Sequence, residues 1–222
     1  MPAPMNMAVI VLMILLVLSS AVYLSVKAFV LHRRVGGLAR IAHAHGMLFA
    51  ADDPFEIPLR YGCFTLFSAG HSQRASCVTY GRGGGRPVRA FDLRYELGHG
   101  TQRQVRHFGA MVVEVPNSLD PAMAWREQRA NEPLSLLYKT GQQGQWCFGG
   151  SADSARRLIH ACRAADIEPE WIELGPIGVL LATGNPPTDG YGVSFNKMSE
   201  FADALFGAVG TAEGNQPGAR GD

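Results

Sequence analysis

The sequence lacks the residue patterns by which most metalloproteins and hydrolases are identified. Its four cysteines form no Cys-x-x-Cys pair, and no histidine stands at zinc-ligand spacing from two of them. We therefore expect no metal site and no cofactor. The sequence also contains no His-Glu-x-x-His, Gly-x-Ser-x-Gly or Gly-Lys-[Ser/Thr] motif. These absences argue against zinc peptidases, hydrolases with a nucleophile elbow and P-loop nucleotidases.

One long apolar run lies near the N-terminus. Residues 7–26 carry no charge, and 12 of the 20 are Val, Ile or Leu. At about 1.5 Å per residue, such a helix matches a bilayer core of about 30 Å. Lys27 can extend to the headgroups, so we expect residues 7–31 to contact lipid. A cleaved signal peptide is the alternative, but it would carry basic residues before a shorter apolar core.

The charges beside this run predict its orientation. Lys27, His32, Arg33, Arg34 and Arg40 follow the run, and no charged side chain precedes it. The positive-inside rule therefore predicts a single-pass protein of the inner (plasma) membrane, with the N-terminus outside and the C-terminal domain in the cytoplasm. The reversed topology is the alternative.

Beyond residue 47 the pattern is that of a folded domain. Four strands are predicted at residues 61–70, 75–81, 88–97 and 104–115, and their short glycine-containing connections are typical of an antiparallel meander. The second half of the chain is predicted to contain both helices and strands. It is predicted to contain hairpins at 134–150 and 170–184, a helix from Asp153 to Ala165, a loop at 185–192 and a helix at 197–209.

We therefore expect an α+β protein, in which an N-terminal transmembrane helix precedes an antiparallel β-meander domain with two packed helices. The predicted units are the anchor with its basic flank (1–34), a juxtamembrane helix (35–46), the soluble domain (47–209) and a disordered tail (210–222). His43 and His45 of the juxtamembrane helix are expected near the headgroups.

The segment Gly81–Arg86, GRGGGR, invites interpretation as a phosphate loop. A phosphate loop needs a helix N-terminus behind it, but here Pro87 and a strand-like alternation follow. An RNA-binding Arg-Gly-Gly tract would repeat, and this one does not. We interpret the segment as a tight turn between two strands.

Charge is locally uneven in a chain with 20 basic and 19 acidic side chains. Between residues 74 and 106 seven arginines accompany only two acids, Asp92 and Glu96. The seven are Arg74, Arg82, Arg86, Arg89, Arg94, Arg103 and Arg106. This basic meander surface is interpreted as a solvated sheet edge, or as a contact for anionic headgroups or a protein. Nucleic acid is disfavoured, because the aromatic residues alternate inward.

Two further groups of residues are candidates for chemistry. Cys147 and His160 are the best nucleophile–base pair that the sequence offers, but a strand-like cysteine and a helical histidine favour structural roles. Asp92, among arginines, is predicted to form a cross-strand ion pair. A β-bulge is expected near Arg89 and Ala90, because Val88 and Phe91 cannot share a face in an unbroken strand.

Residues 61–115 resemble a bacterial family of uncharacterised, single-pass membrane-anchored proteins with a Phe-Asp-x-x-Tyr strand. The matching residues are Phe64, Leu66, Phe67, Gly70, Phe91, Asp92, Tyr95, Gly98, Gly100, Val112 and Val113. The family continues into a Pro-Glu-containing segment, where this chain has PNSLDPAMAWREQ instead. The resemblance implies no activity, cofactor or catalytic residue.

The sequence thus favours a membrane-tethered cytoplasmic domain that binds a protein or the membrane surface without catalysis. The alternatives are an enzyme that acts on a membrane-proximal substrate and a structural subunit of a membrane complex. The oligomeric state is left open.

The orientation can be tested with single cysteines and a membrane-impermeant thiol reagent. In intact cells, a cysteine placed near the C-terminus should react only after the membrane is permeabilised, because the domain lies inside. Rapid labelling of that site in intact cells would instead establish the reversed topology.

Overall fold

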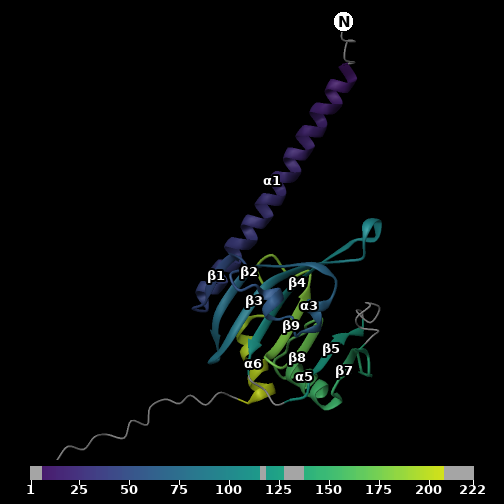
Figure 1. Cartoon of the computed structure of the whole chain (residues 1–222). Coiled ribbons are helices and arrows are strands. Elements are labelled where there is room, and N and C mark those ends of the chain that lie inside the picture. Colours follow the sequence, from purple (N-terminus) through teal and green to yellow (C-terminus); the bar gives the residue numbers. More distant parts are fainter. Residues whose placement is uncertain (1–6, 116–118, 128–137, 208–222) are drawn as a thin grey trace, which may run out of the picture.

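Over residues 7–115, 119–127 and 138–207, which the computed structural model describes, the chain forms one long helix and a nine-stranded antiparallel sheet with further helices (Figure 1). The expected α+β class is confirmed. The strands are β1 (Leu48–Asp52), β2 (His71–Gly83), β3 (Arg86–Leu97), β4 (Gln104–Glu114), β5 (Ala122–Arg126), β6 (Gly141–Gln143), β7 (Trp146–Gly150), β8 (Trp171–Gly175) and β9 (Gly178–Gly184). Their order across the sheet is β1-β2-β3-β4-β9-β8-β5-β7-β6.

The predicted four-stranded meander exists as β1–β4, but its first strand was wrongly placed. Residues 61–70 contain no strand. They follow the short helix α2 (Ile57–Arg60) and include α3 (Thr65–Ser68). Tyr61, Phe64 and Phe67 are all buried on one face of the sheet. Their spacing of three is helical, and aromatic content alone had suggested a strand. The edge strand is β1, which was not predicted.

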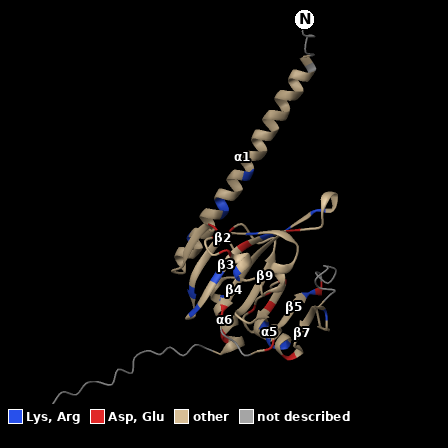
Figure 2. Cartoon of the chain, in the orientation of Figure 1, with Lys and Arg blue, Asp and Glu red and all other residues tan. Residues whose placement is uncertain are grey.

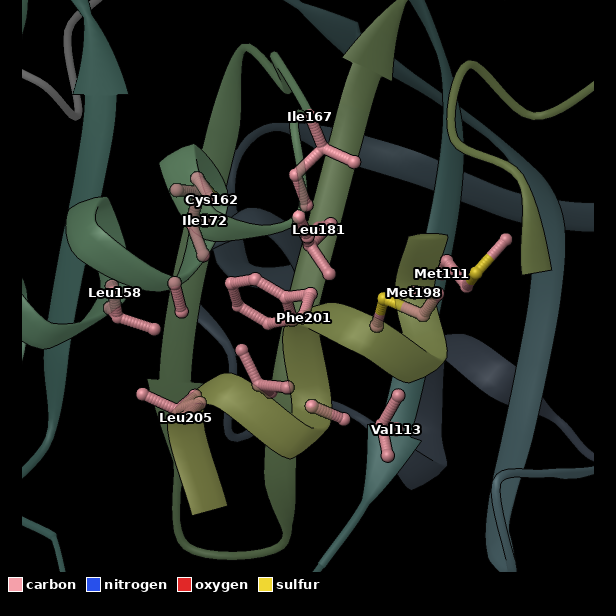
Figure 3. Close-up of a cluster of buried hydrophobic side chains, with 14 of the residues drawn as sticks. Met111, Val113, Leu158, Cys162, Ile167, Ile172, Leu181, Met198, Phe201 and Leu205 are labelled. Carbon is pink, nitrogen blue, oxygen red and sulfur yellow. The ribbon is translucent and has the colours of Figure 1, made fainter. Parts of the chain in front are cut away.

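Two apolar layers cover the sheet, one on each face. Helices α5 (Ala152–Ala164) and α6 (Phe195–Phe206) and the end of α1 (Met7–Ala44) pack on one face. There Leu158 and Phe201 lie among the side chains of the central strands (Figure 3). On the other face, the segment with α2 and α3 packs on a second cluster that contains Phe91 and Trp125.

Both packed helices have serine caps. The Ser151 hydroxyl accepts a hydrogen bond from the Ser154 amide (3.4 Å), and that of Ser194 accepts one from the Lys197 amide (3.4 Å). The predicted cap of the first helix, Asp153, instead lies in its first turn.

The glycine segment is a turn, as predicted. β2 and β3 are joined through Gly84 and Gly85, whose φ values of 56° and 79° suit a two-residue hairpin turn of glycines. The bulge expected in β3 is absent: Val88 and Phe91 simply face opposite layers. The pairing of β2 with β3 has two register shifts instead, one between His71 and Arg74 and one between Ser76 and Thr79. The second lies around Cys77, whose φ is 51°.

The predicted anchor and the predicted juxtamembrane helix are parts of one continuous helix, α1. It is long and apolar enough to span a membrane, and its apolar side chains from Met7 to Leu31 are exposed. Its C-terminal part is buried on the sheet through Leu38 and Ala42, and the helix is followed by Gly46 with a φ of 65°.

Several predictions of the second half agree with the structure. The hairpin β8–β9 and both helices lie close to their expected bounds. The other hairpin is β6–β7, and most of its predicted first strand (134–139) lies outside the described residues. So do the end of the last predicted helix and the predicted tail at 210–222.

Replacement of Leu158 by alanine should lower the free energy of unfolding by about 2–5 kcal/mol, because a fully buried leucine leaves a cavity. Urea denaturation of the full chain in detergent, followed by fluorescence of the buried tryptophans, measures this loss. Leu59→Ala is the matched control, since Leu59 is 79% exposed. Equal losses in the two variants would contradict the described core.

Candidate functional site

The best-defined polar site joins α1 to the sheet. The guanidinium of Arg34 forms a bidentate ion pair with Asp92 of β3: Nε donates to Oδ2 (2.6 Å), and Nη2 donates to Oδ1. The two side chains are only 10% and 6% exposed. They lie 58 residues apart in the sequence, so the pair is a tertiary contact. Asp92 therefore does not form the predicted cross-strand pair with a neighbouring arginine.

The charge of Asp92 is retained despite its burial. Burial alone would raise the pKa of this carboxyl group, but the hydrogen bonds from Arg34 and the nearby imidazole of His107 outweigh burial and lower it. His107 Nε2 lies 3.9 Å from the carboxylate. Asp92 is thus an ionised group held between a helix and two strands.

The loop after β9 closes over this pair. Arg34 Nη1 donates to the carbonyl of Pro187 (2.5 Å), and Nη2 contacts that of Gly190 (3.4 Å). The loop can approach because the residue beside Asp92 on β4 is Gly109. A Cβ atom there would lie 2.5 Å from the carbonyl oxygen of Tyr191. The absence of a side chain at this position therefore lets the loop enclose the ion pair.

Tyr191 anchors the same loop to the bulge of β2. Its hydroxyl donates to the carbonyl of Cys77 (2.5 Å) and lies 2.9 Å from the hydroxyl of Thr79. Burial raises the pKa of Tyr191, and it raises that of the Cys77 thiol to about 11, an effect that Asp92 increases. Both groups stay protonated at neutral pH, so they serve as hydrogen-bonding and packing groups.

A groove of about 340 Å³ lies between α1 and this loop. Its lining includes Ile41, His45 and Phe195, and the rings of His45 and Phe195 are 5.3 Å apart. His45 therefore contacts the folded domain, rather than the headgroups as predicted. The groove is mostly apolar and offers no convergent set of acids and bases.

The seven arginines do not form one surface. Near the β2–β3 turn, Arg82 is exposed, Arg86 is buried against Asp203 of α6, and Arg89 binds Glu114 and the Tyr61 hydroxyl (2.9 Å). Burial, followed by the contact with Glu114, raises the pKa of Tyr61 to about 12. Arg86 and Arg89 are therefore structural ion-pair partners.

The other four arginines lie at the opposite end of β2–β4. Arg74 and Arg94 are directly opposite each other in the sheet, and both are exposed. Arg103 bonds to Glu96, and the hydrogen bond lowers the pKa of that carboxyl group. Arg106 pairs with Tyr95 in the register, so it lies on the face of the sheet that α2 and α3 cover, opposite to the face of Arg74 and Arg94.

The aromatic residues of the Phe-Asp-x-x-Tyr motif are core residues. Phe91 stacks on Tyr61 (6.2 Å between ring centroids), and Tyr95 stacks on Phe108 (5.9 Å). Of the three motif residues, Asp92 alone belongs to the polar site.

The proposed nucleophile–base pair is not assembled. Cys147 is buried in the layer that α2 and α3 cover, whereas His160 is exposed on α5 across the sheet. Within the described residues, no three His, Cys, Asp or Glu side chains are grouped as a metal site.

Sequence reasoning missed three members of the polar site: Arg34, Gly109 and Tyr191. Arg34 was assigned to the basic flank, Tyr191 to the loop at 185–192, and Gly109 to the strand at 104–115. The one signal in the sequence that pointed to this site was Asp92, a charged residue within the strand β3, which is buried on both faces.

No family model and no curated protein sequence matches this chain. Among solved structures, it is similar in fold to the crystal structure of the mycobacterial trehalose monomycolate transport factor A, TtfA. The TM-score is 0.51 with 16% sequence identity, over 79% of this chain and 96% of that chain. The similarity extends over nearly the whole crystallised chain, and at this identity it shows a shared fold.

Replacement of Asp92 by asparagine should lower the free energy of unfolding by about 3 kcal/mol or more at neutral pH, because it leaves a buried guanidinium without its counter-charge. The folded-state pKa of Asp92 lies below the unfolded value of about 3.9, so its contribution is complete above that pH and is lost as the pH falls further. The stability difference between wild type and variant should therefore narrow below about pH 4.

Urea denaturation at several pH values measures this difference. Asp153→Asn is the matched control, because the exposed pair of Asp153 and Arg156 contributes little. A difference between wild type and Asp92→Asn that does not change with pH would contradict an ionised Asp92.

Proposed function

We propose that this protein is a single-pass, membrane-anchored binding module that presents a folded domain at a fixed height and orientation on the membrane surface. The Arg34–Asp92 pair carries the proposal. It locks α1 onto the sheet a few residues after the apolar segment ends at Leu31, so the anchor and the domain behave as one rigid unit. A flexible tether would need no such buried contact.

The chemistry of the described residues supports binding rather than catalysis. Cys147 and His160 are separated by the sheet, and the groove beside α1 is lined mostly by apolar groups. We propose that the anchor crosses the inner membrane with the domain in the cytoplasm, as the basic residues after the apolar run favour.

The structural neighbour supports a role in transport. TtfA is named as a transport factor for trehalose monomycolate. By this analogy of fold, we propose that the present domain is a non-catalytic accessory to transport. Its proposed partner is a protein in the same membrane.

A flexible insertion tests whether rigid presentation matters. A Gly-Ser segment between Leu31 and His32 should leave the anchor and the Arg34–Asp92 pair intact but release the domain from its fixed position. Affinity purification from native membranes should then recover a stoichiometric partner with wild type, and several-fold less with the insertion.

The same insertion after Gly207, at the far end of α6, is the matched control and should retain the partner. Equal recovery with both insertions would rule out rigid presentation. If wild type enriches no protein over an unrelated single-pass protein, a protein partner is ruled out.

A further inference from the structure

The direction of α1 determines which end of the sheet faces the membrane. Arg34 contacts Asp92, whereas Met47, just beyond the end of the helix, lies against Gly81, the β2 partner of Val88. The helix therefore runs opposite to β3. The apolar, N-terminal half of α1 therefore extends in the same direction as the C-terminal end of β3, where a hairpin joins β3 to β4. Figure 1 shows this hairpin standing off the sheet on the side from which α1 leaves.

The distances place the hairpin at the level of the headgroups. Arg34 lies three residues after Leu31, or about 4.5 Å along a helix. Arg94 lies two residues beyond Asp92, or about 7 Å along a strand, and the hairpin extends further. The end of β3 thus reaches the level of Leu31 along the helix axis, where the apolar segment of α1 ends.

Basic side chains are concentrated there on the α1 face. Arg74 and Arg94 are direct cross-strand neighbours, and His107 is the next residue in the same row. Like charges placed opposite each other are destabilising. Glu96 approaches Arg94 only at 3.8 Å and is bonded to Arg103, and among the described residues no ion pair involves Arg74. The row thus carries excess positive charge.

The hairpin also carries an exposed apolar residue. Val105, on β4, is 50% exposed, among only a few large apolar side chains so exposed outside α1 in the described residues. Figure 2 shows basic positions along the strands that lead to this hairpin. Arginines beside an exposed apolar side chain form the pattern of an interfacial contact.

We propose that this end of the β3–β4 hairpin is a second membrane contact, in which Arg74, Arg94 and Arg103 bind the phosphates of anionic lipids in the bilayer that α1 spans. The proposal rests on the membrane anchoring proposed above and adds the site and the ligand. It divides the seven arginines predicted for such a role. Arg74, Arg94 and Arg103 bind lipid, and Arg106 lies at the same end on the opposite face of the sheet. Arg82, Arg86 and Arg89 lie at the other end of the strands.

The contact can be measured with an environment-sensitive fluorophore on the hairpin. The full chain carries Thr101→Cys, labelled with a nitrobenzoxadiazole dye, and Cys63→Ser to remove the exposed native thiol. It is reconstituted into phosphatidylcholine vesicles with or without about one-third phosphatidylglycerol. Emission should shift to the blue with anionic lipid, and high salt should reverse the shift.

Two double variants locate the effect. Arg94→Gln with Arg103→Gln should reduce the ratio of docked to undocked hairpin by about thirtyfold, since each arginine near the surface contributes about fivefold. Arg82→Gln with Arg157→Gln removes the same charge from exposed positions elsewhere and should keep the full shift. Circular dichroism confirms that both variants are folded.

The outcomes separate the two proposals. Failure of the chain to float with the vesicles would overturn the anchor itself. Flotation without a lipid-dependent shift would overturn the hairpin contact and leave the anchor standing. An equal loss of shift in both double variants would mean a general charge effect, which also overturns the site.

Discussion

The arrangement of this protein depends on one buried ion pair. Arg34 and Asp92 are removed from water, and each alone would be costly there. Together, with the carbonyls of Pro187 and Gly190 on the guanidinium, they leave few polar atoms without partners. The pair therefore favours one register of α1 on β3, because sliding the helix by a turn would bury two unpaired charges.

That constraint determines several features around it. Gly109 is needed because the loop that covers Arg34 passes directly over β4. The bulge at Cys77 leaves a carbonyl for the Tyr191 hydroxyl, which holds the same loop from its other end. An irregular strand, a glycine and a loop thus form a single enclosure. The bulge in β2, the glycine in β4 and the irregular loop after β9 thus have one common role, which is to enclose the ion pair.

The sequence predicted the parts of the fold that depend on local pattern. The apolar run, strands β2–β4, the Gly84–Gly85 turn and the β8–β9 hairpin follow from periodicity and turn chemistry. The segment 61–70 was misassigned because aromatic residues have high strand propensity, while here burial at helical spacing prevails. Arg34 could not be matched to Asp92, since a contact across 58 residues leaves no trace in a single sequence.

The division of the arginines shows why a charge count is a poor guide to a surface. Seven arginines within 33 residues look like one patch, but antiparallel strands of about a dozen residues carry them to opposite ends of the sheet. At one end they are used internally, by Asp203 and Glu114. At the other end one carboxylate, Glu96, lies within 4 Å of two of them, Arg94 and Arg103. The second end therefore has more exposed arginine to offer a ligand, and it is the end towards which the apolar half of α1 extends.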